Sequence, residues 1–239
     1  MPLIETELDE IEVTPFPLDE EAVVPLARVR PWLSPDEIER AGRFRFEVHR
    51  DRFIRGRGMM RVLLALRLGV DPASLVFALG EKGKPRLVGS TLGFNLSHSE
   101  GRAALAIGGL PGIGVDIECY DRRVDLDGLG RRCFRESEIE WMNRFPPEER
   151  HHAFFRIWTA KEARMKATGE GFQLEPKRIE LGFEDDFPVR CLEPVDPPAH
   201  LAAVKLADGG AACCVVALAS FRVRIADLPD FRAGGDPAP

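Results

Sequence analysis

The chain has 239 residues, of which 44% are hydrophobic and 30% are charged, and its formal net charge is −6 at neutral pH. These proportions are ordinary for a globular protein and exclude collagenous, disordered and disulfide-scaffold classes. The length fits one large domain or two small ones. No apolar run is long enough to cross a bilayer, the first residues do not resemble a signal peptide, and the five cysteines lack CxxC spacing. We therefore expect a cytoplasmic protein with no membrane part.

The charge is unevenly distributed along the chain. Residues 1–21 contain eight acids and no lysine or arginine, and we interpret them as a solvated lead-in without a function. Residues 40–67 contain nine arginines and two acids, a local charge of +7. A basic segment on an acidic chain argues against general nucleic-acid binding, which favours a basic domain. It indicates a small polyanionic ligand instead.

Periodicity and turn residues predict the elements in chain order. Ser34, with Glu37 three residues later, predicts the start of the first helix. The predicted elements are helices over 36–43 and 47–68, strands over 75–79, 86–88, 93–96, 103–107 and 113–118, helices over 125–133, 136–143 and 148–167, and strands over 179–182, 202–205 and 213–219, followed by a frayed tail over 233–239.

The strands cluster instead of alternating strictly with helices, which is typical of the α+β class. Each half contains one long helix and about three strands that we expect to be antiparallel. We therefore predict two similar subdomains, 1–110 and 111–239, each a long helix packed on a small antiparallel sheet, with a ligand cleft between them.

Two carboxylates lie on the predicted strand over 113–118. Asp116 and Glu118 are two residues apart, so they share one face, while Val115 and Ile117 face the other way. Two carboxylates on one face repel each other unless a proton, water or a cation separates them. A Mg²⁺ ion with phosphate oxygens is one solution. An ordinary solvent-facing strand is the alternative.

The predicted helix over 148–167 contains a second group of functional side chains. Trp158, Glu162 and Lys166 follow one another at four-residue intervals and therefore share a face. Glu162 could complete a metal site, and Lys166 could neutralise a departing phosphate. The alternative is a surface Glu162–Lys166 ion pair beside a core tryptophan.

Several residues of the first half can bind anions. Ser97 and His98 lie in the sequence Asn-Leu-Ser-His-Ser and can donate to phosphate oxygens. Lys84, in the loop Gly-Lys-Pro-Arg, is a further candidate, as are Arg50 and Arg57 on one face of the arginine-rich helix. Turn chemistry and solvated arginines are the alternative explanations.

The order and spacing of these motifs resemble the 4′-phosphopantetheinyl transferases, in particular the long, pseudo-dimeric Sfp-like class. The motifs are Gly-Lys-Pro at 83–85, Phe-Asn-Leu-Ser-His-Ser at 94–99, Gly-Ile-Gly-Val-Asp-Ile-Glu at 112–118 and Trp-Thr-Ala-Lys-Glu-Ala-Arg-Met-Lys at 158–166. The resemblance spans about residues 30–225. It implies a Mg²⁺-dependent enzyme, with Mn²⁺ as a possible substitute, that transfers the phosphopantetheine arm of coenzyme A to a serine of an acyl or peptidyl carrier protein and releases 3′,5′-ADP.

The resemblance also implies roles for individual residues. Asp116, Glu118 and Glu162 would bind the metal, with Asp116, Glu162 and Lys166 forming the catalytic set. Glu162 is the preferred base for the serine proton, directly or through water. The residues that would contact coenzyme A are Arg50, Arg57, Lys84, Ser97 and His98. Two fused halves imply that a monomer suffices.

Two other functions use the same residues. A binding module would hold coenzyme A or a carrier without transfer, and a Mg²⁺-dependent phosphohydrolase would use water as the nucleophile. Carrier proteins are typically acidic, so basic residues early in the second half are candidates for the docking surface, with a solvated face as the alternative. They are Arg122, Arg123, Arg131 and Arg132.

Overall fold

The computed structural model describes residues 10–80, 83–110, 112–171, 174–192 and 198–231. The predicted frayed tail over 233–239 lies outside these residues. No helix in the described part of the chain is both long enough and apolar enough to span a bilayer.

The first half begins with a strand and contains one dominant helix. Its elements are β1 (Glu10–Pro17), α1 (Leu26–Val29), η1 (Arg30–Trp32), α2 (Pro35–Gly42), α3 (Glu47–Leu68), η2 (Pro72–Ser74), β2 (Phe77–Leu79), β3 (Pro85–Leu87), β4 (Gly93–Ser99) and β5 (Arg102–Gly108). The Ser34 N–H donates to the Glu37 carboxylate over 3.0 Å at the start of α2, as the capping pattern predicts. Helix α3 ends at Gly69, which has a left-handed φ of 67°.

The second half repeats the plan of a long helix on a small sheet. Its elements are β6 (Gly114–Cys119), α4 (Leu126–Cys133), α5 (Glu136–Asn143), α6 (Arg150–Thr168), η4 (Pro176–Arg178), β7 (Leu181–Glu184), β8 (Phe187–Cys191), β9 (His200–Ala203), β10 (Ala211–Ala217) and β11 (Arg222–Ile225).

The principal sheets have the strand orders β11-β1-β5-β4 and β6-β10-β9, and β2-β3 and β7-β8 form separate hairpins. The β1–β5, β5–β4, β6–β10 and β10–β9 pairs are antiparallel, whereas β1 and β11 are parallel. The α+β class is therefore confirmed.

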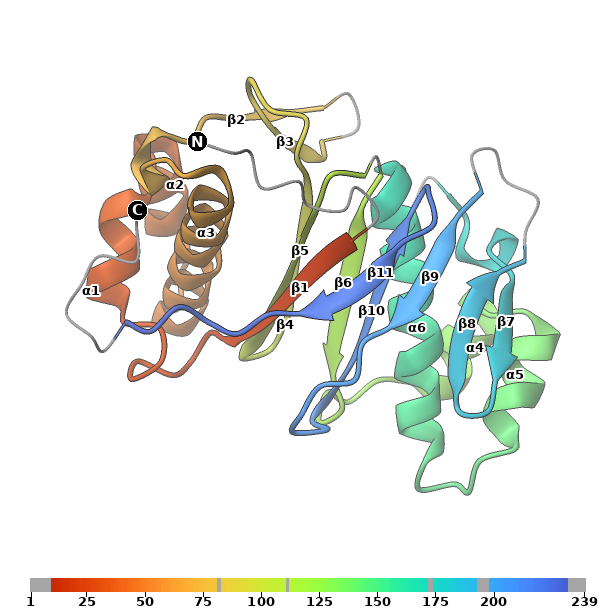
Figure 1. Ribbon diagram of the computed structural model, residues 1–239. Helices are drawn as coiled ribbons and strands as arrows, with labels where there is room; N and C mark the ends of the chain where they lie inside the picture. The colour runs from red at the N-terminus through yellow and green to blue at the C-terminus, as the bar shows by residue number, and fades with distance from the viewer. Residues whose placement is uncertain (1–9, 81–82, 111, 172–173, 193–197, 232–239) are drawn as a thin grey trace.

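The two halves share a central core. Helix α3 lies on the outer side of the first sheet and α6 on the outer side of the second (Figure 1). Between the sheets, Val13 of β1 and Ala106 of β5 pack in one apolar cluster with Val115 and Ile117 of β6. Side chains alternate along a strand, so these contacts turn Asp116 and Glu118 toward α6.

The interpretation of the acidic N-terminal segment as a solvated lead-in is wrong for residues 10–17. These residues form β1, which pairs with both β5 and β11, and Ile11 and Val13 are fully buried. The glutamates of β1 concealed the alternation with Ile11 and Val13. Arg224 of β11 pairs with Glu10 and Glu12, so acids that look solvated in the sequence are neutralised by the far end of the chain.

The end of the chain also crosses the predicted subdomain boundary. The prediction placed residues 111–239 together in the second subdomain, but β11 joins the first-half sheet beside β1 (Figure 1). Phe231 then packs in the core beneath α3. The C-terminal segment therefore ties the two halves together.

Candidate functional site

The predicted metal-binding strand and the predicted catalytic helix pack directly on each other. β6 lies against α6 at Gly114, where a Cβ atom would come within 2.1 Å of the Ala163 carbonyl oxygen and 2.5 Å of the Ala167 nitrogen. Only glycine permits this approach. The close packing of β6 on α6 brings the side chains of Asp116 and Glu118 near those of Glu162 and Lys166.

Lys166, Asp116 and Ser97 form a closed triangle of hydrogen bonds. The Lys166 ammonium lies 2.6 Å from Asp116 Oδ1 and 2.8 Å from Ser97 Oγ. The Ser97 hydroxyl donates to the same Asp116 oxygen over 2.8 Å. Three elements, β4, β6 and α6, therefore meet at one point, and the motifs that are far apart in the sequence become neighbours.

Glu118 has a second set of partners at the next position of the same face. Its Oε2 accepts a hydrogen bond of 2.5 Å from the Ser99 hydroxyl. Its Oε1 lies 2.5 Å from the guanidinium of Arg122, four residues further along the chain. Asn95 extends the contact between the strands, because its Oδ1 accepts from the Val115 N–H over 2.8 Å. Alternate residues of β4 thus hold β6 through side chains.

Two buried carboxylate oxygens remain unsatisfied. Within the described residues, Asp116 Oδ2 and Glu162 Oε1 have no hydrogen-bond partner. Burial, reinforced by the nearby charge of Asp116, raises the pKa of Glu162 to about 7. Burial also raises the pKa of Asp116, and Lys166 opposes this shift. Orphaned buried acceptors cost free energy, so both oxygens are suited to a ligand that brings positive charge.

The carboxylates do not form a ready-made ligand set. Among the residues that the structure describes, no three histidine, cysteine, aspartate or glutamate side chains converge as a metal site. Lys166 lies on Asp116, and Arg122 lies on Glu118, so cations of the chain itself occupy part of the carboxylate surface. The two orphaned oxygens nevertheless fit a hard divalent cation, because Mg²⁺ is usually held by one or two carboxylates together with substrate oxygens.

A cavity of about 600 Å³ lies between α3 and β4 in the first half. Its walls combine aromatic and aliphatic side chains with several basic ones. The basic residues that line it are Arg40, His49, Arg52, Arg57 and His98, and the apolar ones are Phe44, Phe53, Met60, Phe94 and Leu96. Burial lowers the pKa of His98, and the charges of Lys166 and Arg52 add to the shift. Aromatic walls with several cations suit a base and its phosphates.

The structure separates the predicted anion-binding residues. Arg57 and His98 line the cavity. Ser97 instead faces Asp116. Arg50 pairs with Glu47 and Asp51 of its own helix and is not among the lining residues.

Lys84 is also absent from the cavity wall, and its ammonium donates to backbone carbonyls of the second half. Sequence reasoning missed Arg40, His49 and Arg52. His49 and Arg52 are three residues apart on α3, a helical spacing that could have found them, whereas Arg40 lies on α2.

The local charge of +7 is only partly available to a ligand. Arg55 is buried and donates to the carbonyls of Leu18 and Val24. Arg61 is buried against Glu37 and donates to the carbonyl of Leu75. These two arginines fix loops around α3, so the net charge of the segment overstates its capacity for anions.

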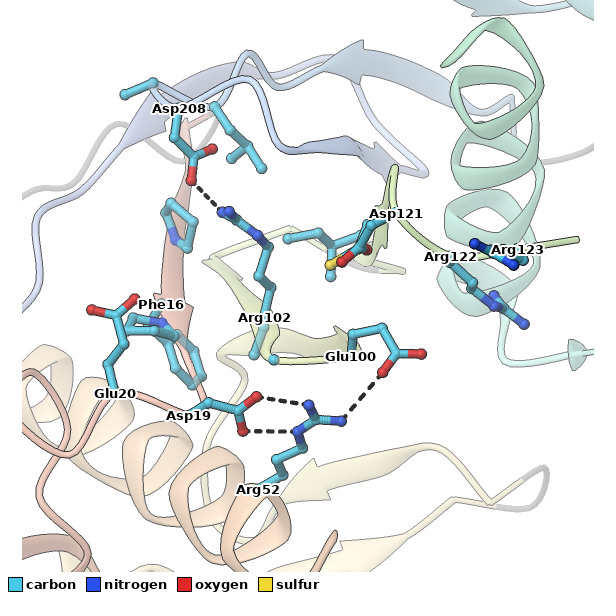
Figure 2. Close-up of a pocket in the computed structure, with 18 residues that line it drawn as sticks. Phe16, Asp19, Glu20, Arg52, Glu100, Arg102, Asp121, Arg122, Arg123 and Asp208 are labelled. Carbon is cyan, nitrogen blue, oxygen red and sulfur yellow. Dashed lines mark hydrogen bonds and ion pairs between the residues drawn. The ribbon is translucent and has the colours of Figure 1, made fainter. Parts of the chain in front are cut away.

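A larger groove of about 830 Å³ lies between the halves (Figure 2). Arg52, which also lines the cavity, is held on one side of the groove by Asp19 at 2.7 Å and by Glu100 at 3.4 Å. Arg122 and Arg123 lie on the opposite side (Figure 2). Groove and cavity therefore adjoin at Arg52 and Glu100, which line both.

Comparisons with known proteins agree on one family. Residues 112–216 match the family model described as the 4′-phosphopantetheinyl transferase superfamily. The chain is 41% identical over 178 residues to the 4′-phosphopantetheinyl transferase HetI of Nostoc sp., an alignment that covers 72% of this chain and 75% of that protein. It is 28% identical over 160 residues to a 4′-phosphopantetheinyl transferase of Bacillus subtilis, covering 66% and 70% of the two chains.

A similar solved structure is a holo-(acyl-carrier-protein) synthase from Bacillus anthracis in complex with CoA (3′,5′-ADP). It has a TM-score of 0.39 and 25% identity, and the match covers 44% of this chain and 92% of that one.

Proposed function

This chain belongs to the 4′-phosphopantetheinyl transferase superfamily, and we infer that it transfers the 4′-phosphopantetheine arm of coenzyme A to a serine of an apo carrier protein, releasing 3′,5′-ADP. The observation that carries the inference is the junction at which Lys166 meets Asp116 and Ser97 beside Glu162. The basic and aromatic cavity next to this junction supports the nucleotide end of the substrate.

The reaction exchanges one phosphorus–oxygen bond for another. The serine oxygen of the carrier bonds to the phosphorus that carries the pantetheine arm, and the bond from that phosphorus to the ADP oxygen breaks. We assign the serine proton to Glu162, directly or through a water molecule, because its carboxylate lies beside Asp116 and Lys166 and can accept a proton within hydrogen-bond reach. Lys166 stabilises the negative charge on the departing phosphate oxygen.

We propose that Asp116, Glu118 and Glu162 hold Mg²⁺, or Mn²⁺ in its place. The orphaned oxygens of Asp116 and Glu162 support this assignment. The ion supplies charge neutralisation for the pyrophosphate of the substrate. We assign Arg57 and His98 to the phosphate groups of coenzyme A, together with Arg40, His49 and Arg52 from the same cavity.

We propose that the acidic carrier docks beside the groove of Figure 2. Arg122 and Arg123 border that groove, and both side chains are exposed. Arg131 and Arg132, at the end of α4, are exposed as well. A single chain supplies both halves, and we propose the monomer as the active unit.

The mass of an apo carrier tests the function. The protein is incubated with coenzyme A, Mg²⁺ and several apo carriers, and each carrier is weighed by intact-protein mass spectrometry. Transfer adds the mass of one phosphopantetheine group and requires the carrier serine. Loss of phosphate from coenzyme A with unchanged carriers would instead identify a phosphohydrolase. Coenzyme A binding without either change would identify a binding module.

Metal dependence is tested in the same assay. Protein freed of metal by a chelator is expected to be inactive and to regain activity with Mg²⁺ or Mn²⁺. Activity that persists in excess chelator would contradict the metal assignment and leave the transfer assignment intact.

A further inference from the structure

Lys84 connects the first half of the molecule to the catalytic helix. Its ammonium lies 2.6 Å from the carbonyl oxygen of Ile113, 2.8 Å from that of Lys166 and 3.2 Å from that of Ala167. All three acceptors belong to the second half, 29 to 83 residues away in sequence. The bonds join the start of the β6 segment to the last turn of α6.

Backbone hydrogen bonds join the described residues Gly80, Gly83 and Lys84. The Gly83 N–H donates to the Gly80 carbonyl over 2.9 Å, and the Gly80 N–H donates to the Lys84 carbonyl over 2.9 Å. Gly83 has a φ of 79°, which only glycine adopts without strain. Pro85 follows, begins β3 and lines the nucleotide cavity. The backbone at this point therefore borders the cavity, while the Lys84 side chain enters the other half.

The end of α6 needs such a partner. The last carbonyls of a helix lack intrahelical donors and carry the negative end of its dipole. A cation placed there donates hydrogen bonds to these carbonyls and also neutralises the dipole. The Gly169 N–H donates to the Lys166 carbonyl over 3.2 Å, and Lys84 provides the second bond to that oxygen. Burial lowers the pKa of Lys84 to about 8, so the ammonium is held at some cost. Its three hydrogen bonds to carbonyl oxygens offset this desolvation cost.

The carbonyl that Lys84 holds belongs to the residue whose side chain completes the catalytic junction. Lys166 places its ammonium on Asp116 and Ser97, while its carbonyl oxygen receives Lys84. A shift of the last turn of α6 would move both ends of Lys166.

We propose that Lys84 is a positioning residue, which holds the last turn of α6 on β6 and so keeps Lys166 at Asp116 and Ser97, and that its side chain does not contact coenzyme A. This inference rests on the proposed transfer activity and changes the role that the sequence predicts for Lys84. The two roles differ in a measurable way, because a lost substrate contact raises the KM for coenzyme A and a misplaced catalytic group lowers kcat.

The steady-state test compares three variants. Lys84→Met removes the charge at similar length, Lys84→Arg keeps the charge, and Arg86→Met removes a neighbouring exposed cation. We expect Lys84→Met to lower kcat by about 10- to 100-fold, as for loss of a charged hydrogen bond, and to change the KM for coenzyme A by less than about threefold. Lys84→Arg should restore part of kcat, and Arg86→Met should resemble the wild type.

Two kinetic results would overturn the proposal. One is a raised KM for coenzyme A with kcat unchanged in Lys84→Met, which would make Lys84 a substrate contact. The other is no change in either parameter. If Lys84→Met does not fold, Lys84→Gln, which keeps a donor without the charge, takes its place and is judged by the same criteria.

Hydrogen exchange tests the positioning role without any substrate. In Lys84→Met, the amides over 166–169 and at Ile113 and Gly114 should exchange faster than in the wild type, while those of β5 should not change. Arg86→Met should leave all of them unchanged. Unaltered exchange in Lys84→Met overturns the proposal. Absence of transfer by the wild-type protein, with exchange altered as expected, would instead contradict the proposed function alone.

Discussion

Two adjacent charged residues of α6 have buried side-chain atoms, but only one of them has its hydrogen bonds satisfied. Lys161 is buried and lies 2.7 Å from Glu138, and its ammonium also donates to the carbonyls of Pro176 and Ile179. The next residue, Glu162, has a buried oxygen without a partner in the described part of the chain. A satisfied pair is a structural anchor, whereas an unsatisfied carboxylate lowers stability by about 1–3 kcal/mol unless a ligand completes it. The contrast supports the proposed catalytic role of Glu162 and indicates a structural role for Lys161.

Replacing Glu162 by glutamine should separate activity from stability. We expect Glu162→Gln to lower the rate of transfer by at least about 100-fold, because we assign its carboxylate as the base and as a metal ligand. Stability should be equal to or higher than that of the wild type, since an uncompensated buried charge is removed. Transfer is measured by carrier mass and stability by urea unfolding. Glu149→Gln, an exposed change on the residue before α6, is the control. A strong loss of stability in Glu162→Gln would contradict the assignment.

Glu37 gives a prediction for pH. It is buried against Arg57 and Arg61, and although burial alone would raise its pKa, these arginines and the Ser34 N–H lower it below its ordinary value of 4.5. The charged form therefore stabilises the fold above pH 4.5, and this contribution is lost as the pH falls through the lower folded-state pKa. Removing one partner of a buried ion pair costs about 3–5 kcal/mol.

We expect Glu37→Gln to lower the free energy of unfolding by about 3 kcal/mol at pH 7, with a difference from the wild type that shrinks as the pH is lowered below about 4.5. Glu39→Gln on the same helix is the control, since its pair with Arg43 is exposed and should contribute less than about 1 kcal/mol. Urea unfolding between pH 7 and pH 4 measures both. A difference that grows on acidification would show that the charge on Glu37 is not stabilising.

At the scale of elements, the site depends on how closely one helix approaches one strand. Each sheet has its long helix on the outer side, but β6 and α6 touch backbone to backbone at Gly114. Gly58 has a similar role in α3, where a Cβ atom would meet Val29 at 2.5 Å. The spacing between carboxylates on β6 and the lysine on α6 is thus set by a residue without a side chain.

Gly114→Ala should move β6 away from α6. The added methyl group meets backbone atoms, which cannot rotate aside, so we expect a loss of about 1–3 kcal/mol of stability and a larger fall in transfer than this loss explains. The matched control is Gly42→Ala at the end of α2, where a Cβ atom meets nothing within 4 Å. Chemical unfolding and transfer assays at a temperature where both variants are folded will distinguish them. Full activity in Gly114→Ala would show that the junction tolerates the displacement.

At the scale of the whole molecule, three apolar cores among the described residues hold the two halves and the segment after β10 together. The central core joins the sheets, and the other two lie beneath α3 and α6. The C-terminal segment leaves the second half, pairs with β1 through β11 and places Phe231 in the core of the first half. The stability of the cavity between α3 and β4 therefore depends on residues more than 200 positions after β1.

Phe231→Ala should destabilise the first half. Removal of a buried aromatic ring costs about 3–5 kcal/mol, and we expect that loss in urea unfolding together with weaker coenzyme A binding at temperatures near the transition. Ile225→Ala on β11 is the control, because that side chain is 50% exposed and its removal should cost about 0.5 kcal/mol or less. Equal effects of the two changes would contradict the packing described here.

Much of this architecture follows from local sequence patterns. The long helix over 47–68 and the helix over 136–143 occur at the predicted bounds, since periodicity and glycine stop signals act within a few turns. The alternation in 114–118 correctly divides Asp116 and Glu118 from Val115 and Ile117. The family motifs are also short stretches of sequence, so they predict the family and its reaction without a structure.

Other properties depend on which distant residues meet, and a local pattern does not specify this. The alternation of β1 was hidden by glutamates whose partner, Arg224, lies more than 200 residues away. The arginines of α3 look alike in the sequence, yet Arg61 is buried against Glu37, whereas Arg57, which also pairs with Glu37, keeps part of its side chain on the cavity wall. Lys84 has a loop sequence suited to an anion, but packing of the halves sets its ammonium on the carbonyls of α6. The sequence alone determined which side chains can bind metal or phosphate and which helix, strand or loop carries each of them. Tertiary structure decided which charges are neutralised internally and which remain for a ligand, because desolvation and pairing depend on long-range packing.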